Sequence, residues 1–429
     1  MIAENNYDYE LAISYAREDE KVVERFASEF QNIFADRVFL DKSKIYEFAG
    51  VKDFEGALAS IYGMKARSVV IFYSKKYEEK HFTVIEFNAV IERLQKDKKL
   101  LCFIVSIGDV PVNEAIKKNH YFSYFIKNLD RDEQCKKIVA AIKETMMHNN
   151  LLQAKQIDQD IDLKIQSITS PNNRPSWEKN YNWCILLGEF METDGRRLKA
   201  PYAWPDVLAS LGKDFANFKK HIYKLGLDEI KINIILNCHL SLAYALGRWY
   251  GDIIEKRGNP NLVLQGTKNG TKFDFSRIVL PDTPLPMPEI KVLDGNKGSN
   301  DTVVILKICS GNEDMDFQVK YYCDNVIHLD YDQILYFKYN ARIAEKAAGK
   351  HLKEIAEFII QQISDKGSKL PGRKIHLFAG TMAALMFVLG GRSRYLGPVQ
   401  LYEYNFNTQE YTPSLCTDNI FCWERESHA

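Results

Sequence analysis

Between residues 8 and 147 the chain alternates short apolar runs with segments in which apolar residues recur at helical spacing. Parallel strands that are buried on both faces read as continuous apolar runs, as Val69–Tyr73 and Leu101–Val105 do. Strands that alternate with amphipathic helices are typical of a parallel α/β sheet. The predicted strands are Glu10–Ser14, Arg37–Leu40, Ser68–Tyr73 and Leu100–Ser106. The predicted helices are Lys21–Phe34, Phe54–Tyr62, Val84–Lys96 and Asp132–Met147.

A polar stretch follows this region. From about Asn149 to Pro175 the chain is rich in Gln, Asp, Asn and Ser, and it ends in a run that contains two prolines. Such composition is typical of a linker. We therefore predict a linker over residues 148–175, with room for one short helix, between a domain at 1–147 and a second domain at 176–429.

The second domain contains an internal repeat. Lys231–Gly247 matches Lys374–Gly390 without a gap, and each segment reads as a strand, a loop of small residues, a helix and a terminal glycine. Two tandem Rossmann-like halves are the simplest account of this repeat. Upstream, the two copies are predicted to share a strand (Trp183–Leu187; Val303–Ile308) and a long helix (Pro205–Leu225; Ala341–Ser364).

Composition narrows the class of protein. The 429 residues carry 57 basic and 57 acidic side chains, so no overall field attracts DNA, RNA or an anionic membrane. The longest apolar runs are too short to span a bilayer, and the first residues do not read as a signal peptide. The eight cysteines and nine histidines are scattered without metal-ligand spacing. We expect a cytoplasmic protein with no metal.

Two segments of the first domain carry a family resemblance. Tyr9–Asp19, an apolar strand ending in Ile-Ser-Tyr-Ala before acidic residues, resembles the first box of a TIR domain. Ser74–Phe87, which holds Tyr77, Phe82 and Glu86, resembles the segment with the catalytic glutamate in TIR enzymes that cleave NAD⁺. The resemblance implies a flavodoxin-like TIR domain at 1–147 that acts as an NAD⁺ glycohydrolase and releases nicotinamide.

Glu86 is the candidate catalytic residue. The leaving group of NAD⁺ is already cationic, so cleavage needs no general acid; it needs a carboxylate near the anomeric carbon and a dry pocket. Helical spacing places Glu86 beside the apolar face of its helix, where it could reach the carboxyl ends of the strands. The alternative interpretation is a solvated helix glutamate.

The resemblance also implies residues that border NAD⁺. These are Tyr15, Asp41, Lys42, Ser74, Tyr77 and Phe82. Asp41–Gly50 corresponds to the BB loop, although it lacks the Arg-Asp-x-x-Pro-Gly pattern of many animal TIR domains, and Phe82 stands where many members have Trp. Ser14 and Ser74 lack a nucleophile elbow and a histidine base, which argues against nucleophilic serines.

The repeat, with His376–Ala379 before its second helix and Val399–Tyr404 after it, resembles a SAVED domain of two fused CARF-like halves. That family senses cyclic oligonucleotides, so the resemblance implies an activating cyclic di- or trinucleotide. The two resemblances together imply a TIR-SAVED effector of CBASS antiphage defence. Its neighbouring subunits are expected to assemble head-to-tail into oligomers or filaments.

Ligand phosphates call for cationic or amide donors and ligand bases call for aromatic faces. The candidate cyclic-nucleotide-binding residues are Lys199, Trp204, His239, Arg248, Gly380, Thr381, Arg392 and Arg394. His239, Gly380 and Thr381 fall in strand-to-helix loops, where ligands usually bind in doubly wound sheets. The alternatives are solvated arginines and a tryptophan in the core.

The sequence therefore predicts a cyclic-oligonucleotide-activated NAD⁺ nucleosidase that depletes NAD⁺ in antiviral defence. NAD⁺ would be a substrate, and no cofactor is expected. The alternative is a non-enzymatic TIR adaptor that relays a cyclic-nucleotide signal to a partner protein. An enzymatic second domain is disfavoured because it lacks a Gly-x-Gly-x-x-Gly phosphate loop.

Overall fold

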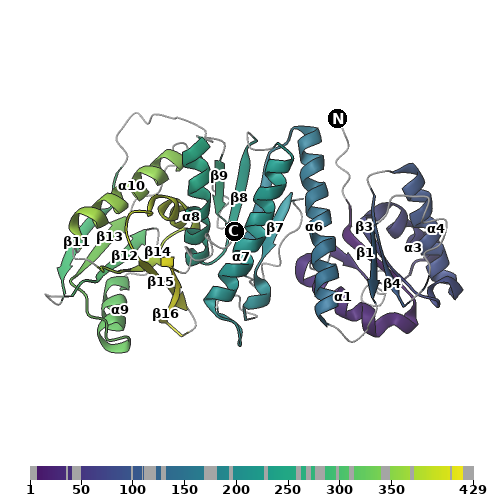
Figure 1. The fold of residues 1–429 in the computed structure, drawn as a ribbon, viewed down its shortest axis with the longest axis horizontal. Helices are drawn as coiled ribbons and strands as arrows, with labels where there is room; N and C mark the ends of the chain where they lie inside the picture. Colours follow the sequence, from purple (N-terminus) through teal and green to yellow (C-terminus); the bar gives the residue numbers. More distant parts are fainter. Residues whose placement is uncertain are drawn as a thin grey trace. The chain divides into compact units, whose positions relative to one another are not determined.

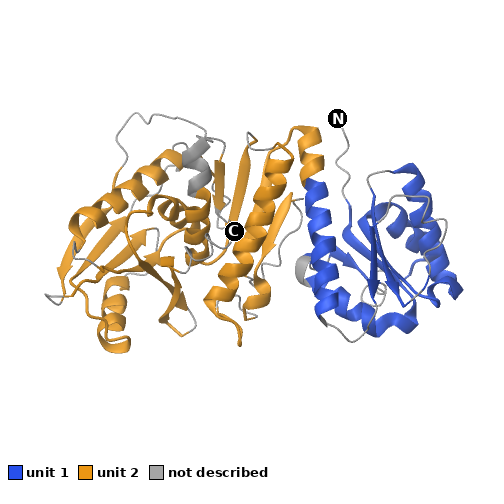
Figure 2. Ribbon diagram, viewed as in Figure 1, with its two compact units in different colours: residues 1–150, 174–180 blue, residues 151–173, 181–429 orange. Residues whose placement is uncertain are grey.

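The computed structural model divides the chain into two compact units (Figure 2). Unit 1 comprises residues 1–150 and 174–180, and unit 2 comprises residues 151–173 and 181–429. The structure describes residues 7–34, 37–40, 50–97, 100–108, 110, 122–126, 132–168, 181–192, 197–226, 230–257, 262–266, 272–275, 286–295, 299–308, 314–339, 348–367, 372–405 and 408–418.

Unit 1 is built on a parallel sheet. Its strands are β1 (Tyr9–Tyr15), β2 (Val38–Phe39), β3 (Ala66–Tyr73), β4 (Leu101–Ile107) and β5 (Phe122–Ile126), in the order β2-β1-β3-β4-β5. All neighbouring pairs are parallel, which is the flavodoxin-like arrangement. The four predicted strands are confirmed. The sequence analysis missed β5 because most of its side chains are exposed and it lacks a continuous apolar run.

Helices cover both faces of this sheet. Two short 3₁₀ turns are η1 (Arg17–Asp19) and η5 (Tyr77–Glu79), and a π-helical turn, η4 (Ile61–Lys65), extends one helix. The α-helices are α1 (Glu20–Phe34), α3 (Phe54–Ser60), α4 (His81–Lys96) and α6 (Asp132–Ile157). Figure 1 shows α1 and α6 on one face and α3 and α4 on the other. The core under α3 and α4 joins Leu58 and Val90 to Val69, Ile71 and Ile104 of the sheet.

The predicted linker at 148–175 is wrong where the structure describes it. Helix α6 continues to Ile157, and residues 161–166 form β6 (Ile161–Gln166), a strand of unit 2. The sequence of β6 alternates apolar and polar residues, which is the pattern of a half-buried strand, but its polar surroundings concealed it. Residues 169–175 lie outside the described residues.

Unit 2 contains two sheets. The first has β7 (Trp183–Leu186), β8 (Ile232–Asn237), β9 (Leu262–Gly266) and β10 (Lys272–Asp274), in the order β10-β9-β8-β6-β7. The second has β11 (Glu289–Asp294), β12 (Thr302–Ile308), β13 (Gln333–Tyr339), β14 (Ile375–Gly380), β15 (Val399–Asn405) and β16 (Glu410–Cys416), in the order β11-β13-β12-β14-β15-β16.

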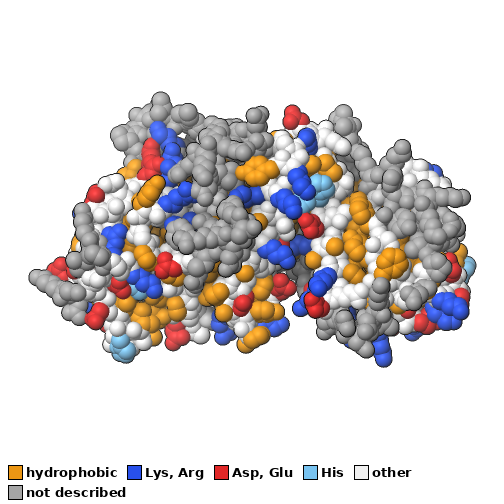
Figure 3. Space-filling view, viewed as in Figure 1, with side chains coloured by type: hydrophobic (Ala, Val, Ile, Leu, Met, Phe, Trp, Pro, Cys, Tyr) orange, Lys and Arg blue, Asp and Glu red, His pale blue; other side chains and the backbone are white. Residues whose placement is uncertain are grey.

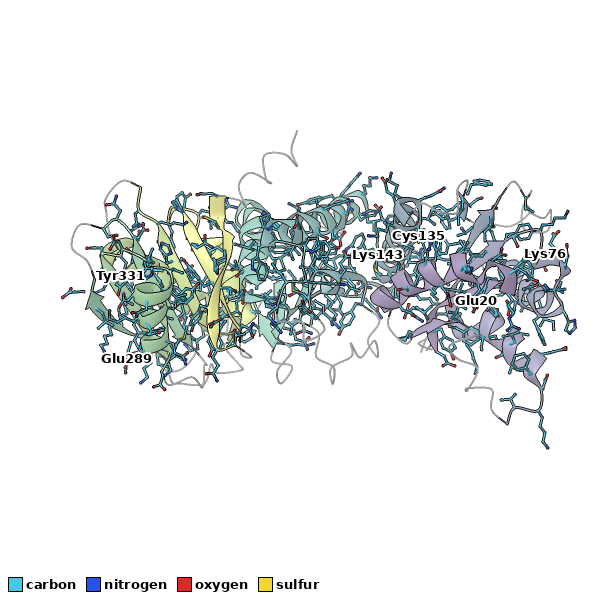
Figure 4. The ribbon with its side chains drawn as sticks, turned by 90° about the horizontal axis from the view of Figure 1, so that it is seen from below. Glu20, Lys76, Cys135, Lys143, Glu289 and Tyr331 are labelled. Atoms are coloured by element: carbon cyan, nitrogen blue, oxygen red, sulfur yellow. The ribbon has the colours of Figure 1, made fainter. Side chains whose placement is uncertain are left out.

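The two sheets repeat one topology. Apart from the additional edge strand β11, each sheet has the same order, and its last strand in sequence pairs antiparallel at one edge. Figure 4 labels Glu289, the first residue of β11, and Tyr331, which comes just before β13; β11 and β13 are antiparallel neighbours, so the two residues lie at opposite ends of this pair of strands. The duplication is confirmed, but β6 is the counterpart of β12. The predicted pairing of Trp183–Leu187 with Val303–Ile308 is therefore wrong.

Five α-helices of unit 2 lie in the described part of the chain. They are α7 (Trp204–Lys224), α8 (Leu240–Arg257), α9 (Met315–Tyr321), α10 (Ala348–Lys366) and α11 (Ala383–Arg392); the short turns are η6 (Gly188–Phe190) and η7 (Tyr322–Val326). The predicted helix at Ala341–Ser364 corresponds to α10, and residues 341–347 lie outside the described residues.

Helices α8 and α11 cross at two glycines. A Cβ atom on Gly247 would lie 1.7 Å from the backbone oxygen of Phe387, and one on Gly390 would lie 2.0 Å from the backbone oxygen of Tyr244. Tyr244 stands one turn before Gly247, and Phe387 stands one turn before Gly390. The contact is therefore reciprocal, and it joins the two halves backbone to backbone.

Among the helices that the structure describes, none is long and apolar enough to cross a membrane. Within the same residues, no group of His, Cys, Asp and Glu side chains could hold a metal ion. Basic and acidic side chains are interspersed over the described parts of the face in Figure 3, in keeping with the zero formal net charge.

Candidate functional site

A polar cluster lies at the carboxyl edge of the first sheet. Strand order reverses between β1 and β3, and open α/β sheets bind ligands outside the strand ends at such a point. Ser14 and Tyr15 end β1, and Ser74 directly follows β3. Helix α4 begins shortly afterwards and brings Glu86 to the same edge.

Glu86 is buried and hydrogen-bonded. Its side chain is 4% exposed, and the Ser14 hydroxyl donates a hydrogen bond to its Oε2. The Tyr77 hydroxyl lies 2.5 Å from Ser14 Oγ. Burial, together with the nearby charge of Glu86, raises the pKa of Tyr77 well above its usual range, so the phenol keeps its proton. The solvated-glutamate interpretation of Glu86 is therefore wrong.

The start of α4 fixes the spacing between Tyr77 and Glu86. The Thr83 hydroxyl shares its one proton between the backbone oxygen of Lys80, at 2.9 Å, and the backbone oxygen of Tyr77. The Tyr77 ring packs against Tyr73 and Phe87, at 5.8 and 6.4 Å between ring centroids. The turn that carries Tyr77 and the helix that carries Glu86 are thus tied together.

Ser74 belongs to a neighbouring contact. Its hydroxyl donates to Asp19 Oδ2 at 2.6 Å, which links the loop after β3 to η1. Burial raises the pKa of Asp19, and the hydrogen bond from Ser74 opposes that shift. Ser74 therefore holds the loop after β3 against η1, and its hydroxyl bonds Asp19 rather than Glu86.

The other predicted NAD⁺-binding residues are less central. Tyr15 is half-buried at the end of β1. Phe82 is 47% exposed and packs edge-on against Phe54, at 5.4 Å. Asp41 and Lys42 lie outside the described residues.

The structure thus unites Glu86 and Tyr77 with Ser14, whose part in the site the sequence analysis missed. The sequence did contain a signal for Ser14, because it is a polar residue near the carboxyl end of an otherwise apolar strand. A buried carboxylate oriented by a hydroxyl can stabilise positive charge that develops on a ligand.

A second polar cluster lies at the carboxyl edge of the sheet that contains β6 and β8. His239 is buried; its Nδ1 lies 2.8 Å from Ser167 Oγ, and its backbone N–H donates to the same oxygen at 3.0 Å. The half-buried Trp204 packs edge-on against His239 at 5.3 Å. Ser167 was missed because it follows β6, inside the stretch predicted to be a linker.

The corresponding edge of the last sheet holds Gly380 and Thr381. Gly380 ends β14, beside the buried Lys307 near the end of β12. Thr381 is half-buried, and its Oγ1 has no hydrogen-bond partner among the residues that the structure describes. The two halves also meet near α8, where the Ser241 backbone N–H donates to Glu403 Oε1 at 2.7 Å.

Three of the four predicted cationic ligands, Arg248, Arg392 and Arg394, lie elsewhere. Arg248 is 1% exposed at the helix crossing, with Nη1 3.3 Å from Ser393 Oγ. Arg392 ends α11, the opposite end from Thr381, and lies 3.7 Å from Glu357. Arg394 follows the same helix end. The structure does not bring these three arginines to the edge that holds His239. Lys199 is exposed in the loop between β7 and α7, which leaves the carboxyl end of β7 at that edge, and its backbone N–H donates to the backbone oxygen of Phe190 at 2.9 Å.

Comparison with known proteins identifies part of the second unit. The family model SAVED, "SMODS-associated and fused to various effectors sensor domain", matches residues 218–416. The match begins within α7, so β6 and β7 precede it although they complete the first of the two sheets. A search of curated proteins gives no match.

Two solved structures show the extent of similarity. The Acinetobacter baumannii Cap4 SAVED/CARF-domain containing receptor with the cyclic trinucleotide 3'3'3'-cAAA is 14% identical, with 96% of this chain and 81% of that chain covered and a TM-score of 0.42. The Moraxella osloensis Cap4 receptor is 11% identical, with 95% and 87% covered and a TM-score of 0.37. On the family match, residues 218–416 form a SAVED domain.

Proposed function

We propose that this chain is an NAD⁺ nucleosidase activated by a cyclic oligonucleotide. The observation that carries the proposal is the buried Glu86 carboxylate, held by Ser14 at the β1–β3 edge. Cleavage of the nicotinamide bond builds positive charge on the ribose, and a preoriented carboxylate in a water-poor site stabilises such charge. Glu86 is the catalytic residue in this proposal.

The TIR resemblance supports the assignment of unit 1. The residues that carry it, from Ser14 to Asp19 and from Ser74 to Glu86, meet at one edge of a sheet with flavodoxin-like order. Under this proposal residues 1–147 act as a TIR domain, and NAD⁺ enters at that edge between Tyr15 and Phe82.

The SAVED domain supports the assignment of unit 2 as a sensor. Its ligand would lie at the strand ends, with Ser167, His239 and Trp204 in the first half and Gly380 and Thr381 in the second. Binding would favour an assembly in which neighbouring copies in the cytoplasm complete the NAD⁺ site head-to-tail. The output would be NAD⁺ depletion in CBASS antiviral defence.

One observation favours a second candidate. Glu86 is almost fully buried, so NAD⁺ reaches it only if the edge opens. A TIR domain whose edge stays closed would act as an adaptor that relays the cyclic-nucleotide signal to a partner protein.

Nicotinamide release separates the two functions. The full chain is incubated with NAD⁺, alone and with a panel of cyclic di- and trinucleotides that includes cAAA. Release with one ligand only is the expected result. Release without ligand would remove the gating from the proposal, and silence with every ligand that binds would favour the adaptor.

Replacing His239 with alanine is expected to weaken binding of the activating ligand roughly tenfold or more, because it removes the imidazole that Ser167 and Trp204 hold at the strand edge. Calorimetry on the full chain measures this loss. His221→Ala is the matched control, since His221 lies in the last turn of α7 and bonds the backbone oxygen of Asn217. Equal binding by both variants would place the ligand elsewhere.

A further inference from the structure

We propose that Ser14 and Tyr77 are positioning residues that orient the Glu86 carboxylate through two hydrogen bonds in series. This inference rests on the proposed NAD⁺ cleavage. It assigns Tyr77 a place behind the carboxylate, whereas the sequence resemblance placed it beside NAD⁺.

The three side chains come from three elements that are distant in sequence. Ser14 lies in β1, Tyr77 in η5 and Glu86 in α4. Their exposed fractions are 0%, 1% and 4%, so water has little access to the bonds between them. Buried hydrogen bonds that are linked in series strengthen one another.

The direction of the bonds follows from the protons available. Ser14 has a single hydroxyl proton and donates it to Glu86, so Ser14 Oγ is left to accept from Tyr77. The phenol can donate throughout the physiological range because burial and the charge of Glu86 keep it protonated. The order is therefore Tyr77 to Ser14 to Glu86.

The surroundings fix the two donors. Tyr77 is held by Tyr73 and Phe87 on its ring, and Thr83 bonds its backbone oxygen. Next to Ser14, the backbone oxygen of Ile13 accepts a hydrogen bond from Tyr62 at 2.9 Å. The backbone that carries Ser14 and the ring of Tyr77 are thus held in place, and a Glu86 carboxylate that rotates away loses its hydrogen bond from Ser14.

This arrangement has a distinct kinetic signature. Ser14 and Tyr77 are buried deeper than Glu86 and are not expected to touch NAD⁺, so their loss should leave KM nearly unchanged. A misaligned carboxylate stabilises the transition state less well, which lowers kcat. Because the two bonds act in series, losing Tyr77 should matter only while Ser14 is present.

The test uses the full-length protein with its activating ligand and measures nicotinamide release. Ser14→Ala is expected to lower kcat by roughly tenfold to a hundredfold with KM within about twofold. Tyr77→Phe, which keeps the ring packing, should lose only a few-fold. The double variant should be no slower than Ser14→Ala alone. Ser68→Ala is the control, because Ser68 is a buried serine near the other end of β3 and its hydroxyl has no partner among the described residues.

Other outcomes overturn the inference. Wild-type kcat in both single variants, losses that multiply in the double variant, or a rise in KM at constant kcat would each do so. Thermal unfolding shows whether a slow variant is simply unfolded, and Tyr77→Phe then decides the matter alone. Failure of the proposed function looks different. In that case the wild-type protein would release no nicotinamide with any ligand, and it would be indistinguishable from the Glu86→Gln variant.

Discussion

Replacing Glu86 with glutamine is expected to reduce nicotinamide release by at least about a hundredfold at saturating activator and NAD⁺. The amide is neutral and cannot stabilise the positive charge that develops on the ribose. The loss should appear in kcat, since the carboxylate acts mainly in the transition state.

The fold should survive this change. Glutamine has nearly the same size as glutamate, and its amide oxygen can accept the Ser14 hydrogen bond that Glu86 Oε2 accepts now. The melting temperature and the affinity for the cyclic oligonucleotide should therefore stay close to the wild-type values, which separates lost chemistry from lost structure.

Glu92→Gln is the matched control on the same helix. Glu92 is exposed and pairs with Lys96 at 2.5 Å, a solvent-screened contact whose loss should change neither activity nor stability appreciably. An activated Glu86→Gln protein that turns over within a few-fold of wild type would rule out Glu86 as the catalytic residue.

Gly247→Ala and Gly390→Ala are expected to destabilise unit 2 by at least about 3 kcal/mol each. In both cases the new methyl group would meet a backbone oxygen of the opposite helix at 2.0 Å or less. A backbone oxygen cannot rotate away as a side chain can, so α8 and α11 must separate. Urea unfolding monitored by tryptophan fluorescence measures the effect, since four of the five tryptophans (Trp183, Trp204, Trp249 and Trp423) belong to unit 2.

Gly63→Ala provides the comparison. A methyl group at Gly63, in unit 1, would lie 3.9 Å from the Cβ of Ala89, an ordinary contact. This variant should leave the tryptophan-monitored unfolding of unit 2 unchanged, and unit 1, followed by circular dichroism, should unfold within about 1 kcal/mol of wild type. The reciprocal geometry also requires similar losses at Gly247 and Gly390. A large loss at one and none at the other would contradict the crossing described above.

Local pattern was enough to find β1, β2, β3 and β4 of unit 1, and the TIR resemblance nominated Glu86. Continuous apolar runs reveal strands that are buried on both faces, whereas β5 and β6 are edge-exposed or alternating and were missed. The bond between Ser14 and Glu86 joins residues 72 apart in sequence, and no local pattern encodes that pairing.

The candidate ligand-binding residues of unit 2 show a related limit. The rule that ligands bind at strand ends selected His239, Gly380 and Thr381, and these do lie at the two sheet edges. The search for positive charge selected Arg248, which is buried at the helix crossing. Sequence reveals that a residue is charged, but the direction of its side chain depends on how α8 packs on α11.

Unit 2 consists of two similar halves in one chain, and this has a consequence for molecular symmetry. In a homodimer of such halves every contact would occur twice, and the site would match ligands with a twofold axis. Here the halves are free to differ: the position of His239 before α8 is occupied by Met382 before α11. Under the proposed sensor function, an activating ring of three nucleotides would have no twofold axis, and two unlike halves need not present one to it.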